Sequence, residues 1–413
     1  MWRRIIAAQE SGLVVVIALL MAFLTFAGSA SWTSTRSWMI AHVGSIAKQI
    51  PEGGAKPLAL RITIPAGAAV ELPTPTRLIV RTSTSVQQQD SETEWEVRDL
   101  DDGSKLAKGA RSVNKFLDVE NLLNVLTTAS YYAIMAVGMT AIIILAGIDL
   151  SIGSIYAIAA IVGASVLSSI ESKSAGTSAL LAVPLLLLVC CSIGALGGLI
   201  NGFSSVALRV HPFIITLGTM AIYRGAVFVF TQGQTVSGLP DSIQRGFFKW
   251  ELHIGSGGVF PVPTLITILV GLAGAIVLSR TVFGRRIYAI GGNEIAAKYA
   301  GIPVGRVKTM VYTISGALAG LAAAIYVGYF GAAENGAGQG YELNVIAAAV
   351  IGGASLSGGR GSAFGAVLGA ILVQLINNGM LILDINQSYN QIVMGLAIII
   401  AVVVDQTKTR LTK

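Results

Sequence analysis

The chain has 413 residues, of which 54% are hydrophobic and 12% are charged, and its formal net charge is +7. That composition is too apolar for an ordinary soluble domain. Apolar runs long enough to cross ~30 Å of hydrocarbon recur along most of the sequence, which predicts one polytopic helical bundle in a lipid bilayer. Much of the basic charge lies in short segments beside these runs. The positive-inside rule explains that placement better than nucleic-acid binding, so we expect no nucleic-acid partner.

Residues 1–31 hold a short cytoplasmic N-terminus and the first apolar run, 13–30. Arg3 and Arg4 precede the run and small residues end it, so a cleaved signal peptide is one interpretation. We favour an uncleaved first span, because residues 1–10 suit a short amphipathic helix at the membrane surface. Under either interpretation, the segment that follows lies outside the cytoplasm.

Residues 32–118 are polar and carry charges of both signs. Alternating runs at 58–64, 77–82 and 94–98 are separated by prolines, which predicts a small β-rich extracytoplasmic insertion after the first helix. The mixed charges are typical of a solvated face, and long loops both carry function and tolerate insertion.

Nine further apolar runs fall within a predicted permease bundle at 119–405. They lie at 129–146, 150–170, 180–208, 213–231, 262–278, 310–330, 343–356, 363–383 and 392–404. With the first run, the sequence predicts about ten transmembrane helices in an all-α membrane fold. An even number places both termini on one side.

The loop at 281–308 fixes which side that is. It contains five basic residues and a single acid, Glu294, so the positive-inside rule makes it cytoplasmic. Each span takes the chain to the opposite side of the membrane. Counting spans in both directions from this loop also places Arg209, Arg360 and the tail at 406–413 in the cytoplasm. Both termini are therefore expected to be cytoplasmic.

Catalytic signatures are absent from the sequence. It has no GxxxxGK[ST] phosphate loop and no HExxH, and its only histidines are His42, His211 and His253. We expect a chain that is not an enzyme, hydrolyses no ATP itself and holds no metal or cofactor. A membrane-bound enzyme is disfavoured because no nucleophile, base and orienting group stand out.

The first polar break in the apolar sequence is AGIDLSIGS, residues 146–154. An ionisable residue such as Asp149 is expensive at membrane depth unless it is paired, hydrated or caps a broken helix. Asp149 together with Ser151 can cap a helix that starts there, and we favour that interpretation over direct substrate contact.

The second break is GAAENGAGQGYELN, residues 331–344, where glycines interrupt the helix and Glu334 and Glu342 add charge. A re-entrant element that lines a pathway and an extracellular loop explain it equally well. The third, IGGASLSGGRGS at 351–362, indicates tight helix packing rather than a nucleotide site. Farther on, Gln374, Asn377 and Asn378 place amides on a membrane helix, where they bond neighbouring helices or line a hydrophilic route.

A short helix is predicted at 293–299 inside the cytoplasmic loop. Asn293 suits its N-cap and Glu294 its first turn, where the helix dipole favours negative charge. Docking of a soluble partner and simple anchoring at the membrane are both open on this evidence.

These segments together resemble the ribose-type, monosaccharide branch of ABC importer permeases. The resemblance covers 121–405 and is carried by AGIDLSIGS, GLINGFSSVALRVHPFIITLGTMAIYRG, GRRIYAIGGNEIAAKYAGIPVGRVK, GYELNVIAAAVIGGASLSGGRGSAFGAVLGAI and NNGMLIL. It implies a bacterial inner-membrane subunit in a homodimer or heterodimer, served by a cytoplasmic ATPase that uses ATP and Mg and by an extracytoplasmic sugar-binding protein. The insertion at 32–118 departs from the family, whose members usually have a short connection there.

The resemblance also assigns candidate residues. The segment at 293–301 is similar to the family's coupling loop, and the candidates for ATPase coupling are Arg285, Arg286, Asn293, Glu294, Ala296, Ala297, Lys298 and Gly301. Sugar hydroxyls need hydrogen-bond partners inside an apolar bundle. The candidates for that polar pathway are Asp149, Ser151, Asn201, Glu334, Asn335, Glu342, Asn344, Asn377 and Asn378.

The expected function is therefore import of a simple sugar, a ribose-like monosaccharide or a related polyol, by alternating access. A permease for a nucleoside or a branched-chain amino acid is the nearer alternative. An ion- or proton-driven secondary transporter is the more distant one, suggested by the same acids and broken spans.

Overall fold

A computed structural model gives the fold of the chain. It describes residues 9–28, 33–36, 60–64, 69–71, 77–82, 85–90, 93–99, 105–112, 116–117, 119–173, 176–244, 246–250, 252–254, 257–383, 385–397, 399 and 403. The chain divides into two compact units, one at 22–118 and one formed by the remainder. Each unit is described by itself.

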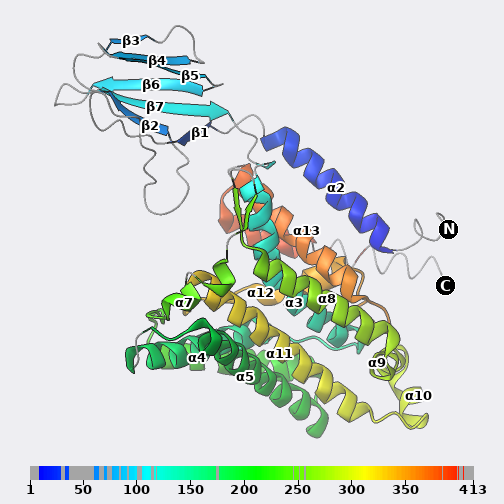
Figure 1. The fold of residues 1–413 in the computed structure, drawn as a ribbon. Coiled ribbons are helices and arrows are strands. Elements are labelled where there is room, and N and C mark those ends of the chain that lie inside the picture. Colours follow the sequence, from blue (N-terminus) through cyan, green and yellow to red (C-terminus); the bar gives the residue numbers. More distant parts are fainter. Residues whose placement is uncertain are drawn as a thin grey trace. The chain divides into compact units, whose positions relative to one another are not determined.

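The described residues of the unit at 22–118 form seven short strands in two antiparallel groups (Figure 1). The strands are β1 (Thr33–Arg36), β2 (Leu60–Ile64), β3 (Ala69–Glu71), β4 (Arg77–Thr82), β5 (Ser85–Asp90), β6 (Thr93–Asp99) and β7 (Lys105–Ser112). Strand β7 pairs with β1, β2 and β6, while β3, β4 and β5 follow one another in a second sheet. Of the alternating runs of the sequence, 77–82 and 94–98 lie on β4 and β6, and the described part of 58–64 is β2.

The larger unit is a helical bundle. Its elements are α3 (Val119–Ile144), α4 (Ile152–Lys173), α5 (Ala179–Ala207), α6 (Pro212–Thr231), α7 (Asp241–Gln244), η2 (Phe247–Lys249), β8 (Leu252–Ile254), β9 (Gly257–Val259), α8 (Pro261–Arg280), α9 (Val282–Gly292), α10 (Glu294–Tyr299), α11 (Val304–Phe330), α12 (Tyr341–Ile351), α13 (Ala363–Ile382) and η3 (Gln387–Tyr389). The helix α2 (Gln9–Gly28) precedes the strands.

Within the described residues, seven helices are long and apolar enough to cross a membrane: α3, α4, α5, α6, α8, α11 and α13. They coincide with seven of the ten expected spans, and the chain is a multi-pass membrane protein. The apolar part of α2 is shorter, at Gly12–Ala27. The last expected span, 392–404, is described only in part, and 390–397 is helical. The number of spans beyond seven stays a prediction.

Two boundaries differ from the expected spans. Helix α3 begins ten residues before the apolar run at 129–146. The expected span at 343–356 is instead α12, an 11-residue helix, and at 1.5 Å per residue it is about 16 Å long, too short to cross a bilayer. It ends at Gly352 and Gly353, and the φ of +98° at Gly353 is a conformation that glycine adopts readily.

The bundle is held together by close approach of main chains. Helices α5 and α11 lie side by side (Figure 1) and pack against each other more extensively than any other pair. A Cβ added to Gly194 would overlap the main-chain oxygen of Gly316, and one added to Gly198 would overlap that of Tyr312. Small residues allow such packing where lipid offers little hydrophobic drive for association.

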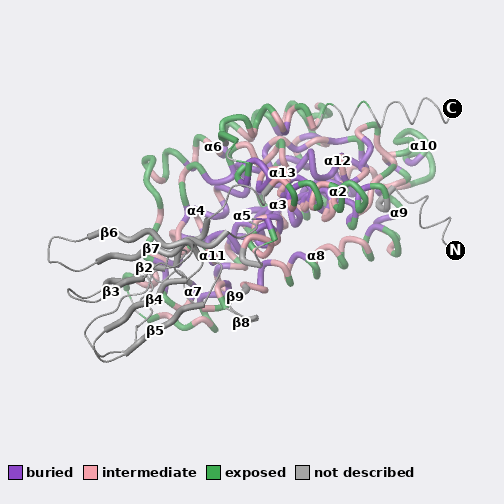
Figure 2. The backbone as a smooth tube through the Cα atoms, turned by 90° about the horizontal axis from the view of Figure 1, so that it is seen from above, coloured by how far each residue is buried: buried purple, intermediate pink, exposed green. Residues whose placement is uncertain are grey.

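Burial is uneven across the bundle. Helix α3 is largely enclosed, while few residues of α6 and α8 are buried (Figure 2). The exposed side chains are large and apolar, as at Phe228 and Leu269. A surface of this kind suits contact with lipid.

Candidate functional site: polar groups inside the bundle and a short capped helix

The chain between α3 and α4 leaves the helical path at 145–151. Ala146 has a φ of +57°, and its N–H donates to Ile143 O at 2.8 Å, while the N–H of Gly147 donates to Ile142 O at 3.0 Å. These bonds satisfy main-chain oxygens at the end of α3. The segment then leads directly into α4. The first polar break predicted from the sequence is therefore a break between two helices of the bundle.

Asp149 organises the polar groups at the start of α4. Its Oδ1 accepts a bond from the N–H of Ser151 at 2.8 Å and from the Ser151 hydroxyl at 2.6 Å. Asn201 of α5 donates to Ser151 Oγ at 2.6 Å and accepts from the hydroxyl of Thr219 of α6 at 2.7 Å. All four residues are buried. This network, Asp149–Ser151–Asn201–Thr219, joins three elements and favours the capping interpretation of Asp149.

The second break, 331–340, reaches the middle of the bundle. Tyr341, the first residue of α12, has its ring 4.8 Å from that of Tyr132, which lies halfway along α3. Helix α12 therefore starts beside the midpoint of a membrane-spanning helix. The loop also touches α4, because a Cβ on Gly153 would overlap Gly338 O and lie 2.7 Å from Glu342 Oε2. Of the two interpretations that the sequence left open, this geometry favours an element within the bundle.

Arg224, which the sequence analysis did not select, fastens this loop to α6. Its Nη1 donates to Ala337 O at 2.8 Å and to Asn335 O at 3.4 Å, and it is close enough to Glu342 to interact electrostatically. The Asn335 side chain adds a bond from Nδ2 to Thr231 Oγ1 at 2.9 Å. The clue available in the sequence was a single arginine in an apolar run, which is itself a functional signal.

Five tyrosines from four helices meet beside the loop. The tyrosine cluster consists of Tyr131, Tyr132, Tyr156, Tyr326 and Tyr341. Ring centroids in neighbouring pairs lie 4.8 to 6.2 Å apart, the range of favourable aromatic contact. The side chain of Asn344 lies within hydrogen-bonding reach of the Tyr132 hydroxyl. Sequence reasoning missed the cluster, because tyrosines in apolar helices carry no pairing signal.

The remaining pathway candidates are dispersed. The side-chain amides of Asn378 in α13 and Asn121 in α3 form two hydrogen bonds with each other, at 2.6 and 3.2 Å, and so join the two helices. Asn377 Nδ2 lies 3.4 Å from Gln374 Oε1 on its own helix. Glu334 is exposed. The structure thus groups Asp149, Ser151 and Asn201 in one network and Glu342 and Asn344 near the tyrosine cluster, with Asn377 and Asn378 in neither group.

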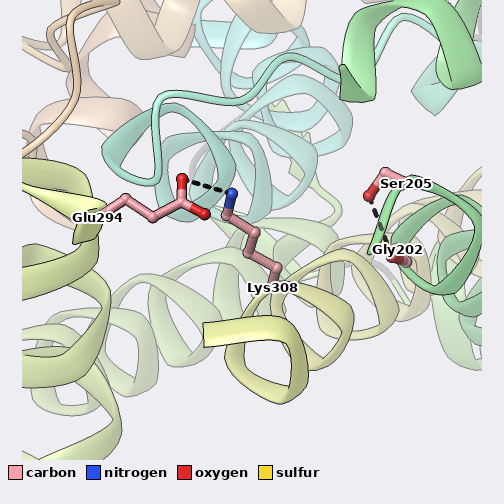
Figure 3. A network of polar contacts seen from close by, with 4 residues as sticks. All are labelled: Gly202, Ser205, Glu294 and Lys308. Carbon is pink, nitrogen blue, oxygen red and sulfur yellow. Dashed lines mark hydrogen bonds and ion pairs between the residues drawn. The ribbon is translucent and has the colours of Figure 1, made fainter. Parts of the chain in front are cut away.

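The basic loop at 281–308 contains the short helix that the sequence predicts. Helix α10 begins after Asn293, whose Oδ1 accepts a bond from the N–H of Ala296 at 2.9 Å, which confirms the N-cap. Gly301 ends it with a φ of +79°. Glu294 Oε2 lies 2.7 Å from Lys308 Nζ at the start of α11 (Figure 3). The helix is therefore capped at both ends and tied to a membrane-spanning helix.

The other coupling candidates in this loop differ in exposure. Ala297 is buried against the bundle, whereas Arg285, Arg286, Ala296 and Lys298 are exposed. A groove of about 880 Å³ runs between the end of α5, the start of α6, α10 and the start of α11. Four basic side chains and one carboxylate line it: Arg209, Lys298, Arg306, Lys308 and Glu294. This face of the bundle is therefore positively charged.

Interrupted helices with polar groups inside an apolar bundle are typical of membrane transport proteins, and the fold defines a chain of that class. The chain belongs to the family of the branched-chain amino acid transport system / permease component, whose model matches residues 121–402. Residues 1–120 lie outside the match.

Relatives of the chain include sugar permeases. The chain is 41% identical to the ribose import permease protein RbsC of Escherichia coli (strain K12) over 294 residues, which are 71% of this chain and 88% of the relative. It is 39% identical to RbsC of Bacillus subtilis (strain 168) over 294 residues, 71% and 87% of the two chains. The galactose/methyl galactoside import permease protein MglC of E. coli is 38% identical over 298 residues, 71% and 88%. No solved structure matches the chain.

Proposed function

We propose that this chain is the membrane-spanning permease subunit of an ATP-driven ABC importer for a simple sugar, a ribose-like monosaccharide or a related polyol. The observation that carries the proposal is the 41% identity to a ribose import permease across 88% of that protein. Relatives for ribose and for galactose both support a monosaccharide rather than an amino acid or a nucleoside.

The proposed topology has about ten spans in a bacterial inner membrane, with both termini in the cytoplasm. Seven helices of spanning length support it, together with the basic loop that contains α10. We assign the strands at 33–112 to a β-rich extracytoplasmic insertion, since the segment follows an N-terminal apolar helix and precedes α3.

The proposed partners are a cytoplasmic ATPase, an extracytoplasmic sugar-binding protein and a second permease chain, identical or related. We assign ATP and Mg to the ATPase, and a docking surface for it to α10. The cap at Asn293, the stop at Gly301 and the Glu294–Lys308 ion pair make α10 a rigid element. Because the ion pair joins it to α11, a displacement of α10 would be transmitted into the bundle.

The proposed mechanism is alternating access at the two breaks. The Asp149–Ser151–Asn201–Thr219 network holds the start of α4 against α5 and α6, and Arg224 holds the 331–340 loop against α6. A change in the angle between α11 and α5 would separate the loop and α12 from α4. Glu342 and Asn344 would then face the opening and offer hydrogen bonds to sugar hydroxyls.

The test is sugar uptake by proteoliposomes that contain this chain, its ATPase and the sugar-binding protein. We expect radiolabelled ribose or galactose to accumulate only when ATP is supplied on the ATPase side, and the tagged chain to retain the ATPase during purification. Uptake by the chain alone, driven by a proton or sodium gradient, would contradict the proposal and favour a secondary transporter.

A further inference from the structure

The tyrosine cluster contains an unusual feature for an apolar bundle. The hydroxyls of Tyr131 and Tyr156 are buried, and neither has a hydrogen-bond partner within the part of the chain that the structure describes. The two side chains are 2% and 0% exposed. A buried hydroxyl without a partner is destabilising, and most native structures avoid it. Phenylalanine would fill the same space without that penalty.

Two other buried tyrosines of the bundle, Tyr223 and Tyr312, form hydrogen bonds. The Tyr223 hydroxyl donates to Gly197 O at 3.2 Å, and the Tyr312 hydroxyl donates to Ile148 O at 3.4 Å. Tyrosine is therefore paired where it serves packing between helices. The two unpaired tyrosine hydroxyls lie in one place, where α3, α4, α11 and α12 meet. The hydroxyls of Thr140 and Ser315 are also buried without a partner among the described residues, but neither belongs to the cluster.

The walls around this place differ in rigidity. Tyr131 and Tyr132 stand on the enclosed helix α3, and Tyr156 stands one turn into α4, which the Asp149 network fixes at its start. The opposite wall is the 11-residue helix α12 and the irregular loop before it, whose Gly338 lies against the ring of Tyr156. Separation of α12 from α3 and α4 would open the cluster between Tyr341 and the pair Tyr132 and Tyr156.

The groups that such an opening would expose match a sugar. Aromatic rings provide a flat apolar surface for the C–H face of a pyranose or furanose, while hydroxyls and amides serve its hydroxyl groups. Tyr131 and Tyr156 supply the hydroxyls, and Asn344 and Glu342 on the first turn of α12 supply an amide and a carboxylate. Ligand sites are usually of this kind, mostly apolar with a few placed polar groups.

We infer that the tyrosine cluster is the closed form of a monosaccharide-binding site, in which the hydroxyls of Tyr131 and Tyr156 bond the sugar when α12 moves away. The inference rests on the proposed function and names the part of the chain that contacts the transported sugar. It also accounts for the two unpaired hydroxyls, since their partner is the sugar.

The experiment compares three single-atom deletions, Tyr131→Phe, Tyr156→Phe and the control Tyr223→Phe. Each variant is assembled with the ATPase and sugar-binding protein, and three quantities are measured: ribose and galactose uptake, sugar transported per ATP hydrolysed, and melting temperature. Removing one hydrogen bond to an uncharged sugar weakens binding about two- to tenfold. We therefore expect Tyr131→Phe and Tyr156→Phe to lower sugar transported per ATP by about that factor.

Melting temperature separates this role from a structural one. Tyr131→Phe and Tyr156→Phe remove an unpaired hydroxyl and should melt at or above the wild-type temperature, while Tyr223→Phe loses a formed bond and should melt lower without losing sugar per ATP. If Tyr131→Phe and Tyr156→Phe both take up sugar at the wild-type rate and transport as much sugar per ATP as the wild type, the inference is wrong. The proposed function would then still stand. If the wild-type complex transports neither sugar, the proposed function fails and the inference falls with it.

Discussion

The guanidinium of Arg224 lies 2.8 Å from the main-chain oxygen of Ala337, and this bond joins the middle of α6 to the loop before α12. The two residues are 113 positions apart. Arginine within a membrane-spanning helix is expensive unless its donors are satisfied. Here two carbonyl groups and the nearby Glu342 satisfy it, so the loop at 331–340 depends on α6 for its position.

Replacing Arg224 should loosen that loop. Arg224→Gln loses a charge-assisted hydrogen bond, of the kind that contributes about 1.5–3 kcal/mol, so we expect a lower melting temperature and slower sugar uptake. Arg224→Lys keeps the charge but not the planar fork and should recover only part of the loss. Thermal unfolding of the purified protein measures the first effect and uptake the second. Arg286→Gln, at an exposed position, is the control for stability. If Arg224→Gln had the same melting temperature as Arg286→Gln, Arg224 would not hold the 331–340 loop in place.

Local signals in the sequence predicted local structure well. The N-cap at Asn293 and the turn at Asp149 and Ser151 involve residues two or three positions apart, and the structure confirms both contacts. Arg224 and the tyrosine cluster depend on helices far apart in sequence, and no alternation or spacing in a single sequence reports such contacts. The length of α12 was also missed, because hydropathy continues past Ile351 although the main chain turns at Gly353.

Asp149 should act mainly as the cap of α4. Asp149→Ala removes the acceptor for two bonds from Ser151 in a buried site, and we expect it to destabilise the protein by about 1–3 kcal/mol. Asp149→Asn keeps an oxygen at the same position and should retain most of the stability and sugar uptake. Chemical denaturation and uptake assays on the pair measure this. Loss of uptake in Asp149→Asn at normal stability would instead assign the carboxylate to the sugar.

The contact of α5 with α11 should not tolerate a single added methyl group. A Cβ on Gly316 would overlap Gly194 O, so Gly316→Ala forces two main chains apart and should destabilise the bundle by about 1–3 kcal/mol. The matched control is Gly218→Ala on α6, where a Cβ would meet nothing within 4 Å. Alanine is the better helix former, so the control should melt at or above the wild-type temperature. Equal melting temperatures for the two variants would refute close packing of these helices.

The ion pair between Glu294 and Lys308 should matter for coupling rather than for stability. The Glu294 side chain is 53% exposed, and exposed pairs usually contribute ~1 kcal/mol or less, so Glu294→Arg should leave the melting temperature nearly unchanged. If α10 docks the ATPase, the same variant should lose stimulation of ATP hydrolysis by the loaded sugar-binding protein.

The double exchange Glu294→Lys with Lys308→Glu restores the pair with reversed charges. Recovery of stimulation in that protein would show that the link from α10 to α11 is what counts, whereas continued loss would place Glu294 in direct contact with the ATPase. Normal stimulation in Glu294→Arg would remove this residue from the coupling surface.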